Sequence, residues 1–209
     1  MNFEFALNLA WWLLASCCLV SFIEHQVHAQ LMHKRNFLSN RDKGFERVFK
    51  AHAIEHHGHY SAMFSDEPVT PGEDKEIRLN VHKAPIKTLP FTLVIALVSW
   101  QWALVFVAMV LVHHWVWNKI HLEMHKPEGR VFSTWGPYLF LARHHYLHHV
   151  HPNKNFNVVF PFADYVLGTN AKATASEKLD MHGLGLLPLS GTELRYLQHA
   201  VVKVPAGKN

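Results

Sequence analysis

The stretch Arg143-His144-His145-Tyr146-Leu147-His148-His149-Val150-His151 contains five histidines in nine residues. Within it, His145, His148 and His149 have the spacing H-x2-HH. On an α-helix these positions lie at about 0°, 300° and 40°, so all three imidazoles project from one face. A surface helix gains nothing from such a row, and a packed core would have to hydrogen-bond every ring. Because neutral imidazole is the commonest metal-ligating side chain, the row predicts a metal site.

Three further histidine groups precede this row, with the spacings H-x4-H, H-x3-HH and H-x3-H. Together the four groups hold ten histidines, too many for one tetrahedral zinc ion, which takes four ligands. Two metal ions with four or five nitrogens each would use them all. The sequence therefore predicts a two-metal centre with these candidate ligands: His28, His33, His52, His56, His57, His121, His125, His145, His148 and His149.

Several neighbouring residues are additional candidates. Four more histidines adjoin the groups, and a shift in register could exchange their roles with those of the ligands: His25, His59, His144 and His151. Three carboxylates could orient ligating rings through the second ring nitrogen, although a solvated helix surface explains them equally well: Glu24, Glu55 and Glu123.

Length and composition narrow the class of protein. The 209 residues suffice for one domain, and we treat residues 1–209 as a single unit. A net charge of +4 with seven tryptophans and long apolar runs suits a membrane protein with basic loops, not a nucleic-acid binder. The adjacent Cys17 and Cys18 indicate neither a disulfide framework nor a thiolate metal site.

The first membrane segment is predicted at about residues 5–23. This stretch carries no charge, and at 1.5 Å per residue it is long enough to cross a hydrocarbon core of ~30 Å. Glu4 stands where a signal peptide carries Lys or Arg, so we expect a retained transmembrane helix. Because the basic residues follow this helix, the positive-inside rule places the N-terminus outside and residues 24–50 in the cytoplasm.

The second membrane segment, about residues 89–117, allows two interpretations. As one helix it would span ~43 Å, too long without tilt or protrusion. A bend near Ser99-Trp100-Gln101-Trp102 would make a hairpin, but no Gly or Pro marks such a bend. Only the hairpin keeps the early and late histidine groups on one side of the bilayer. We therefore expect an all-α integral membrane protein with few transmembrane helices, namely an N-terminal span and a helical hairpin. A cytosolic helical cap carries the histidines, and residues 170–209 form a tail.

The four histidine groups, in this order and with apolar segments between them, carry a resemblance. So does the stretch from Asn153-Lys154-Asn155-Phe156 to Phe160-Pro161-Phe162-Ala163-Asp164-Tyr165-Val166-Leu167-Gly168-Thr169 after the last group. Over residues 24–169 the chain resembles the fatty acid hydroxylase/sterol desaturase superfamily of integral-membrane di-iron enzymes. It departs from many of these hydroxylases in the second group, which has three intervening residues instead of two.

The resemblance implies an O2-dependent oxidoreductase that hydroxylates or desaturates a lipid, which would be a fatty acyl, sterol or related hydrophobic substrate. It implies two iron ions, which zinc can replace in purified material, and O2 as co-substrate. Electrons would come from a cytochrome b5 or ferredoxin type of donor with its reductase, docked on the basic cytosolic loops. The small size and the absence of a C-terminal dilysine signal favour a bacterial inner membrane over the endoplasmic reticulum.

Two other classes of protein remain open from the residues alone. A histidine-rich membrane metal transporter or metal-binding protein would also carry such loops. Transport, however, requires ionisable residues inside the spans, and residues 5–23 and 89–111 contain none. A bis-histidine haem b protein needs histidine pairs deep in facing helices, whereas most histidines here lie outside the apolar segments.

Overall fold

Two long apolar helices organise the fold. The computed structural model describes residues 3–61, 63–68 and 78–203, and within these ranges it is helical without any strand. Helix α1 (Phe3–Val27) continues directly into the π-helical segment η1 (His28–Met32), and α7 (Trp100–His125) follows later in the chain. Both are long and apolar enough to cross a membrane. They leave large apolar side chains such as Trp11 and Leu104 exposed, as a lipid-facing surface requires.

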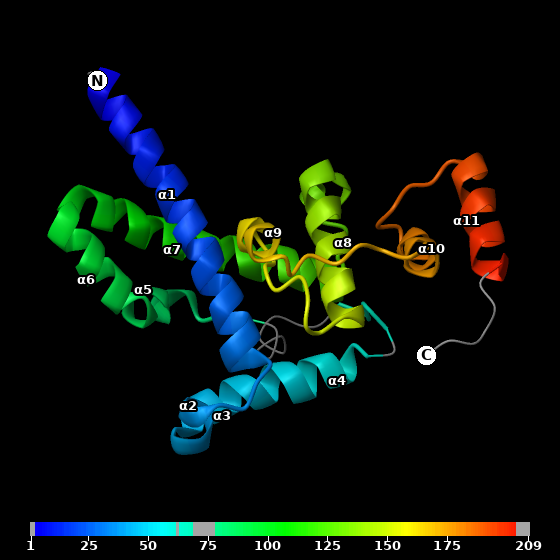
Figure 1. The fold of residues 1–209 in the computed structure, drawn as a ribbon, viewed down its shortest axis with the longest axis horizontal. Helices are drawn as coiled ribbons and strands as arrows, with labels where there is room; N and C mark the ends of the chain where they lie inside the picture. Colours follow the sequence, from blue (N-terminus) through cyan, green and yellow to red (C-terminus); the bar gives the residue numbers. More distant parts are fainter. Residues whose placement is uncertain (1–2, 62, 69–77, 204–209) are drawn as a thin grey trace.

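The chain turns back on itself immediately before α7. Helix α6 (Leu89–Val98) folds back along α7, as Figure 1 shows. Ser99 joins the two helices. Ser99 is extended (φ −160°, ψ 116°), and its hydroxyl accepts a hydrogen bond from the backbone N–H of Trp102 at 3.2 Å. An N-cap of this kind ends one helix and starts the next without Gly or Pro. The predicted hairpin, and with it the predicted fold class, is confirmed.

A third crossing is available if α6 is joined to the segment before it. The short turns η4 (Val81–Lys83) and α5 (Ala84–Lys87) lead into α6, and the chain bends by 59° between Val81–Lys87 and α6. Counted as one broken span, it raises the number of candidate membrane spans from two to three. The hairpin therefore has one short, bent arm and one long, straight arm.

The two long helices are held together by small residues and an apolar core. Ser16 and Ala103 are buried, which lets the helices approach closely. The indole Nε1–H of Trp102 donates to Ser16 Oγ at 3.1 Å. Below this contact the core contains Val20 and Phe106, both buried. As a result, the C-terminal ends of α1 and α7 lie near one another, and both ends carry predicted ligands.

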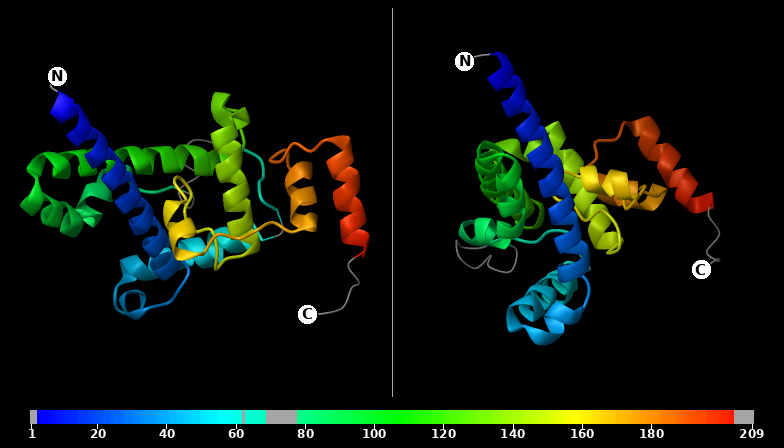
Figure 2. Two further views of the ribbon diagram at one scale, coloured as in Figure 1. Left: turned by 45° about the horizontal axis from the view of Figure 1, so that its top comes forward. Right: turned by 60° about the vertical axis from the view of Figure 1, so that its left-hand side comes forward.

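A cap of shorter helices covers these two ends. The helices α2, α3, η2 and α4 form a rod, cyan in Figures 1 and 2, that crosses below these ends. Helix α8 stands beside the end of α7. Asn36 and Asp42 cap the first two helices of the rod. The elements of this cap are α2 (Phe37–Arg41), α3 (Lys43–Phe49), η2 (Lys50–His56), α4 (His57–His59), η5 (Val131–Thr134) and α8 (Gly136–Val150).

Helix α10 packs on α8, α11 packs on α10, and α9 packs on α1. A second core joins α7, α8 and α10 through Trp117, Tyr146 and Met181, with Phe64 from the loop after α4. Figure 1 places α10 and α11 on the side of α8 away from α6. The remaining helices are α9 (Phe162–Leu167), α10 (Ala175–Gly183) and α11 (Gly191–Lys203).

Candidate metal centre

Two π-turns shape the first half of the site. The backbone N–H of His33 donates to the carbonyl of His28 at 3.2 Å, and that of His57 donates to the carbonyl of His52. These are hydrogen bonds between residues five apart, the pattern of a π-helix. An α-helix would separate such residues by about 140° around its axis. The wider turn instead brings each i, i+5 pair onto one face, so both pairs point at the same place.

The first histidine group consists of five imidazoles whose ligand-type nitrogens all lie within 4.8 Å of one another. Two contacts show how tightly the rings converge. His28 Nε2 lies 2.7 Å from His52 Nε2, and His57 Nε2 lies 3.1 Å from His148 Nε2. The members come from both π-turns and from α8: His28, His33, His52, His57 and His148.

The second histidine group consists of four imidazoles with nitrogens again within 4.8 Å: His56, His125, His145 and His149. His145 Nε2 lies 3.0 Å from His125 Nε2 and 3.2 Å from His149 Nε2. The tenth predicted ligand, His121, stands beside this group. Its ring centroid is 4.7 Å from those of His125 and His145.

Two His-His dipeptides link the groups. Successive residues on a helix point about 100° apart. His57 and His148 therefore join the first group, whereas their neighbours His56 and His149 join the second. The rings of His57 and His149 stack across the boundary with centroids 4.4 Å apart. The three predicted ligands of the row from Arg143 to His151 are thus divided between the groups, with His148 in the first and the other two in the second.

The hydrogen bonds fix which ring nitrogen faces inward. His125 Nδ1–H donates to the Phe64 carbonyl and His148 Nδ1–H to the Lys154 carbonyl, each at 2.7 Å. His28 Nδ1–H donates in the same way to the carbonyl of Phe156. Because a carbonyl only accepts, the proton of each neutral ring sits on Nδ1 and Nε2 presents a lone pair. Within each group these lone pairs face the nitrogens of other imidazoles.

Several buried nitrogens have no hydrogen-bond partner among the described residues. Both ring nitrogens of His56 are in this state, as are Nδ1 of His145 and Nδ1 of His149. Leaving such atoms unpaired costs free energy. A cation bound among converging lone pairs would compensate that cost, and imidazole sets suit Zn, Fe, Cu and Ni. The residues present fit metal binding, and the two adjacent clusters are able to hold metal ions.

The electrostatics of the cap keep its imidazoles in the ligating form. Burial, followed by the neighbouring His57, lowers the pKa of His33 to about 3. Burial lowers the pKa of His57 to about 4. Burial and adjacent imidazoles hold the pKa of His52, and that of His148, well below the ordinary value. Neutral imidazole is the form that binds metal, so the rings are ready to ligate at neutral pH.

Asp164 is a residue that sequence reasoning missed. It is fully buried at the start of α9. One carboxylate oxygen accepts from Phe156 N at 2.9 Å and Thr169 Oγ1 at 2.6 Å, and the other accepts from Asn157 N at 2.8 Å and His144 Nε2 at 2.9 Å. Burial would raise the pKa of Asp164, but these hydrogen bonds bring it below its ordinary value. Asp164 thus fixes the loop whose Phe156 carbonyl orients His28.

The four additional histidine candidates lie outside both groups. His25 Nε2 is 2.9 Å from Thr169 Oγ1, and His144 is paired with Asp164. The other two reach carboxylates of the loop after α4 and of α10, with His59 Nε2 2.7 Å from Asp66 and His151 Nε2 2.8 Å from Glu177. The structure gives all four hydrogen-bonding partners away from the converging lone pairs.

The three carboxylate candidates also point elsewhere than at the ligating rings. Glu24 accepts from Asn157 Nδ2 and Val158 N, each at 3.0 Å, and pairs with His113 at 3.2 Å. Glu123 accepts from the side chains of Arg130 and Ser133 and from the backbone N–H groups of Gly129 and Arg130. Glu55 is exposed. Glu24 and Glu123 hold loops in place, so any effect they have on ligating rings is transmitted through the backbone.

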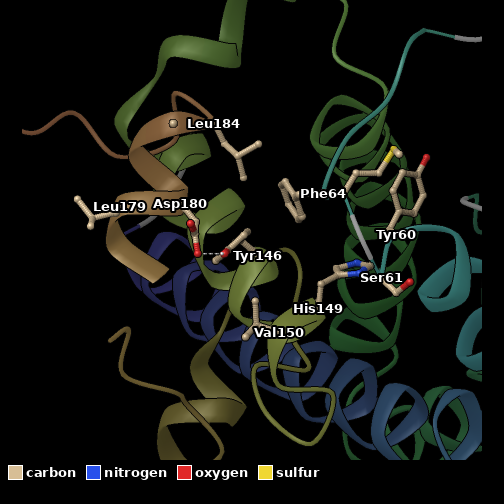
Figure 3. A pocket seen from close by; sticks show the side chains of 11 residues that line it. Tyr60, Ser61, Phe64, Tyr146, His149, Val150, Leu179, Asp180 and Leu184 are labelled. Carbon is tan, nitrogen blue, oxygen red and sulfur yellow. Dashed lines mark hydrogen bonds between the residues drawn. The ribbon is translucent and has the colours of Figure 1, made fainter. Parts of the chain in front are cut away.

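A pocket of about 710 Å³ adjoins the second histidine group. Figure 3 shows His149 and Val150 beneath it, Tyr60 and Phe64 on one wall, and Asp180 with Leu184 on the other. Because His149 belongs to the second group and also lines the pocket, a bound molecule can come within reach of that group.

Comparison with models of known protein families, with curated protein sequences and with solved structures finds no match to this chain. The class of protein is therefore defined by the fold and the site alone. Two long apolar helices end in two adjacent, buried histidine clusters that can hold metal ions. That combination is consistent with a histidine-box membrane protein.

Proposed function

We propose that this protein is an O2-dependent di-iron oxidoreductase that hydroxylates or desaturates a lipid at the membrane surface. The observation that carries the proposal is the gathering of nine imidazoles into two adjacent groups at the ends of candidate membrane spans. When bound there, two iron ions would supply the oxidation of an unactivated C–H bond by O2. The five-nitrogen group exceeds the four ligands of tetrahedral zinc, which favours iron.

Aromatic side chains pack against the imidazoles and wall part of the site. The ring of Tyr60 stacks on His125 with centroids 4.1 Å apart, and Trp117 lies at the same distance from His121. Phe156 packs against His28 at 5.8 Å. A site from which water is excluded protects a strong oxidant from side reactions. The chain itself thus supplies ligands, ring orientation and a dry wall.

A basic surface near the first histidine group supports docking of an electron donor. Six cationic side chains are exposed on the stretch between the two π-turns: Lys34, Arg35, Arg41, Lys43, Arg47 and Lys50. Such a surface attracts an acidic carrier of the cytochrome b5 or ferredoxin type and speeds its association. By the positive-inside rule the same surface would face the cytoplasm.

Two measurements test the function. Purified protein should contain about two iron ions per chain and show no haem absorbance. Lipids from cells with and without the protein, grown under ¹⁸O2, should differ by one labelled hydroxyl or one double bond. A haem spectrum would support the haem alternative. Metal flux into vesicles without lipid oxidation would support transport.

A further inference from the structure

The pocket beside the second histidine group lies between α8, α10 and residues 60–61 and 63–64. Figure 1 places α10 on the side of α8 away from α6. Its inner wall is apolar and buried, with Phe64 6% and Tyr146 8% exposed. Its rim is accessible, with Met63 51% and Leu184 41% exposed. A molecule entering from the rim would therefore move from water into an apolar space that ends at His149.

The rim carries one carboxylate that is open to a ligand. Asp180 is exposed, and its only hydrogen bond among the described residues is a long one of 3.4 Å from the Tyr146 hydroxyl. Glu177, one turn earlier on α10, is occupied by Thr174 N at 2.7 Å and His151 at 2.8 Å. The Tyr146 hydroxyl donates this one bond, which leaves the other acceptor sites of Asp180 open. A carboxylate can accept about four hydrogen bonds and donates none.

We propose that this pocket binds an amphiphile whose head group is a hydrogen-bond donor, an amine or a hydroxyl, recognised by Asp180. The hydrocarbon segment would lie between Phe64 and Leu184 and point toward His149 (Figure 3). Carboxylate or phosphate head groups would be repelled by Asp180. The inference rests on the proposed function in one respect, since it takes the end nearest His149 as the reacting end.

Protection of an introduced thiol tests the pocket without metal or O2. Leu184→Cys, in a background with Cys17→Ser and Cys18→Ser, places a reactive thiol at the rim of protein held in nanodiscs. The probes are dodecan-1-amine, dodecan-1-ol, dodecane and dodecanoate, and the readout is the rate of N-ethylmaleimide labelling. The amine or the alcohol should protect at about 10-fold lower concentration than dodecane or dodecanoate. The stronger of the two identifies the head group.

Matched variants separate recognition from unspecific partitioning. Ser176→Cys, exposed on the same helix, should be labelled at one rate with every probe. Asp180→Leu should reduce protection by the amine and the alcohol to the level of dodecane. Should Leu184→Cys fail to fold, Met63→Cys reports from the other side of the rim.

Two results would overturn the proposal: equal protection by all four probes, or protection that Asp180→Leu leaves unchanged. Both are distinguishable from failure of the oxidoreductase function, which would appear as normal protection without any oxidised lipid.

Discussion

Single hydrogen bonds decide how each histidine can serve the site. The Nδ1–H groups of His28, His125 and His148 all donate to backbone carbonyls, which leaves Nε2 to face inward. Partners of this kind orient a ligating ring and raise its basicity. For His28 the carbonyl lies 128 positions away in the chain. The sequence could therefore predict which residue types ligate, but not which of their nitrogens.

With Fe²⁺ in excess, each group can be emptied by a single substitution while the other stays filled. His148→Ala should remove the metal of the first group and His125→Ala that of the second, each leaving about one iron ion per chain and no lipid oxidation. Metal analysis of purified variants, with circular dichroism as the check on folding, measures this. His199→Ala, on the exposed surface of α11, should retain both ions. Full iron occupancy in His148→Ala or His125→Ala would contradict the ligand assignment.

Asp164 should matter for stability although it touches no metal. Asp164→Asn replaces an acceptor of four hydrogen bonds by a group that must turn an amide N–H₂ toward donors. Breaking such a buried network costs about 3 kcal/mol. The midpoint of thermal unfolding should fall accordingly, and iron affinity at the first group should weaken. Glu67→Gln, an exposed carboxylate, is the control and should change neither quantity. An unchanged midpoint in Asp164→Asn would rule out the bracing role.

Nine of the ten predicted ligands meet in two groups, whereas the role of Asp164 could not be predicted. The spacing of the histidines can be read from the sequence because each of the four H-x-H patterns lies within ten residues. The partners of Asp164 come from a loop, from α8 and from Thr169, so only the tertiary fold reveals them. The available signal was a lone aspartate in the apolar stretch from Phe160 to Leu167, where an unpaired charge would be costly.

At the scale of elements, the π-turns explain spacings that an α-helical reading leaves unexplained. Residues five apart lie about 140° apart on an α-helix and cannot share a metal ion. In η1 and η2 they do converge, which accounts for both H-x4-H and the span from His52 to His57. A histidine spacing of five next to a helix is therefore a signal for a π-turn, and such turns often mark functional sites.

Inserting one alanine between Gln30 and Leu31 tests the π-turn directly. The insertion lengthens the spacing from His28 to His33 from five residues to six, which places the two rings about 120° apart on an α-helix, so His33 moves out of the first group. Iron content should fall to about one ion per chain while the second group stays filled. Gln30→Ala is the matched control and should retain both ions, because the Gln30 side chain is exposed. Two ions in the insertion variant would show that the five-residue spacing is dispensable.

For a related reason, local sequence does not distinguish a hairpin from one straight helix in this segment. Gly and Pro are the usual markers of a break, and neither occurs between Leu97 and Trp102. The break depends on Ser99 as an N-cap in the middle of an apolar run. Serine is tolerated inside membrane helices, so its presence alone does not separate a bent segment from a straight one.

At the scale of the whole molecule, the metal-free protein should lose stability in mild acid. The folded pKa of His33 is about 3 and that of His57 about 4, whereas an unfolded histidine titrates near 6.5. Because the unfolded chain takes up protons first, stability is complete above about pH 6.5 and falls as the pH drops toward 4. Thermal unfolding in nanodiscs between pH 7.5 and 4.5 measures it. A flat profile would contradict burial of these rings.

The side of the membrane on which the histidine groups lie stays a prediction, and so does the identity of the host membrane. Because the hairpin returns the chain to the side where it started, the π-turns and α8 can meet on one surface of the bilayer. The net positive stretch after α1 predicts that this surface is cytoplasmic.

The two His-His dipeptides, each divided between the groups, imply that the two ions are not taken up independently. Because His57 and His148 belong to the first group, an ion bound there would immobilise the backbone at 56–57 and at 148–149, and with it two rings of the second group. The conformational entropy lost in ordering these residues is then lost only on binding the first ion, so the second ion binds more tightly. Titration of the metal-free protein with Fe²⁺ should accordingly give a sigmoidal isotherm with a Hill coefficient above one. Intermediate loading should yield chains that are full or empty more often than chains holding a single ion.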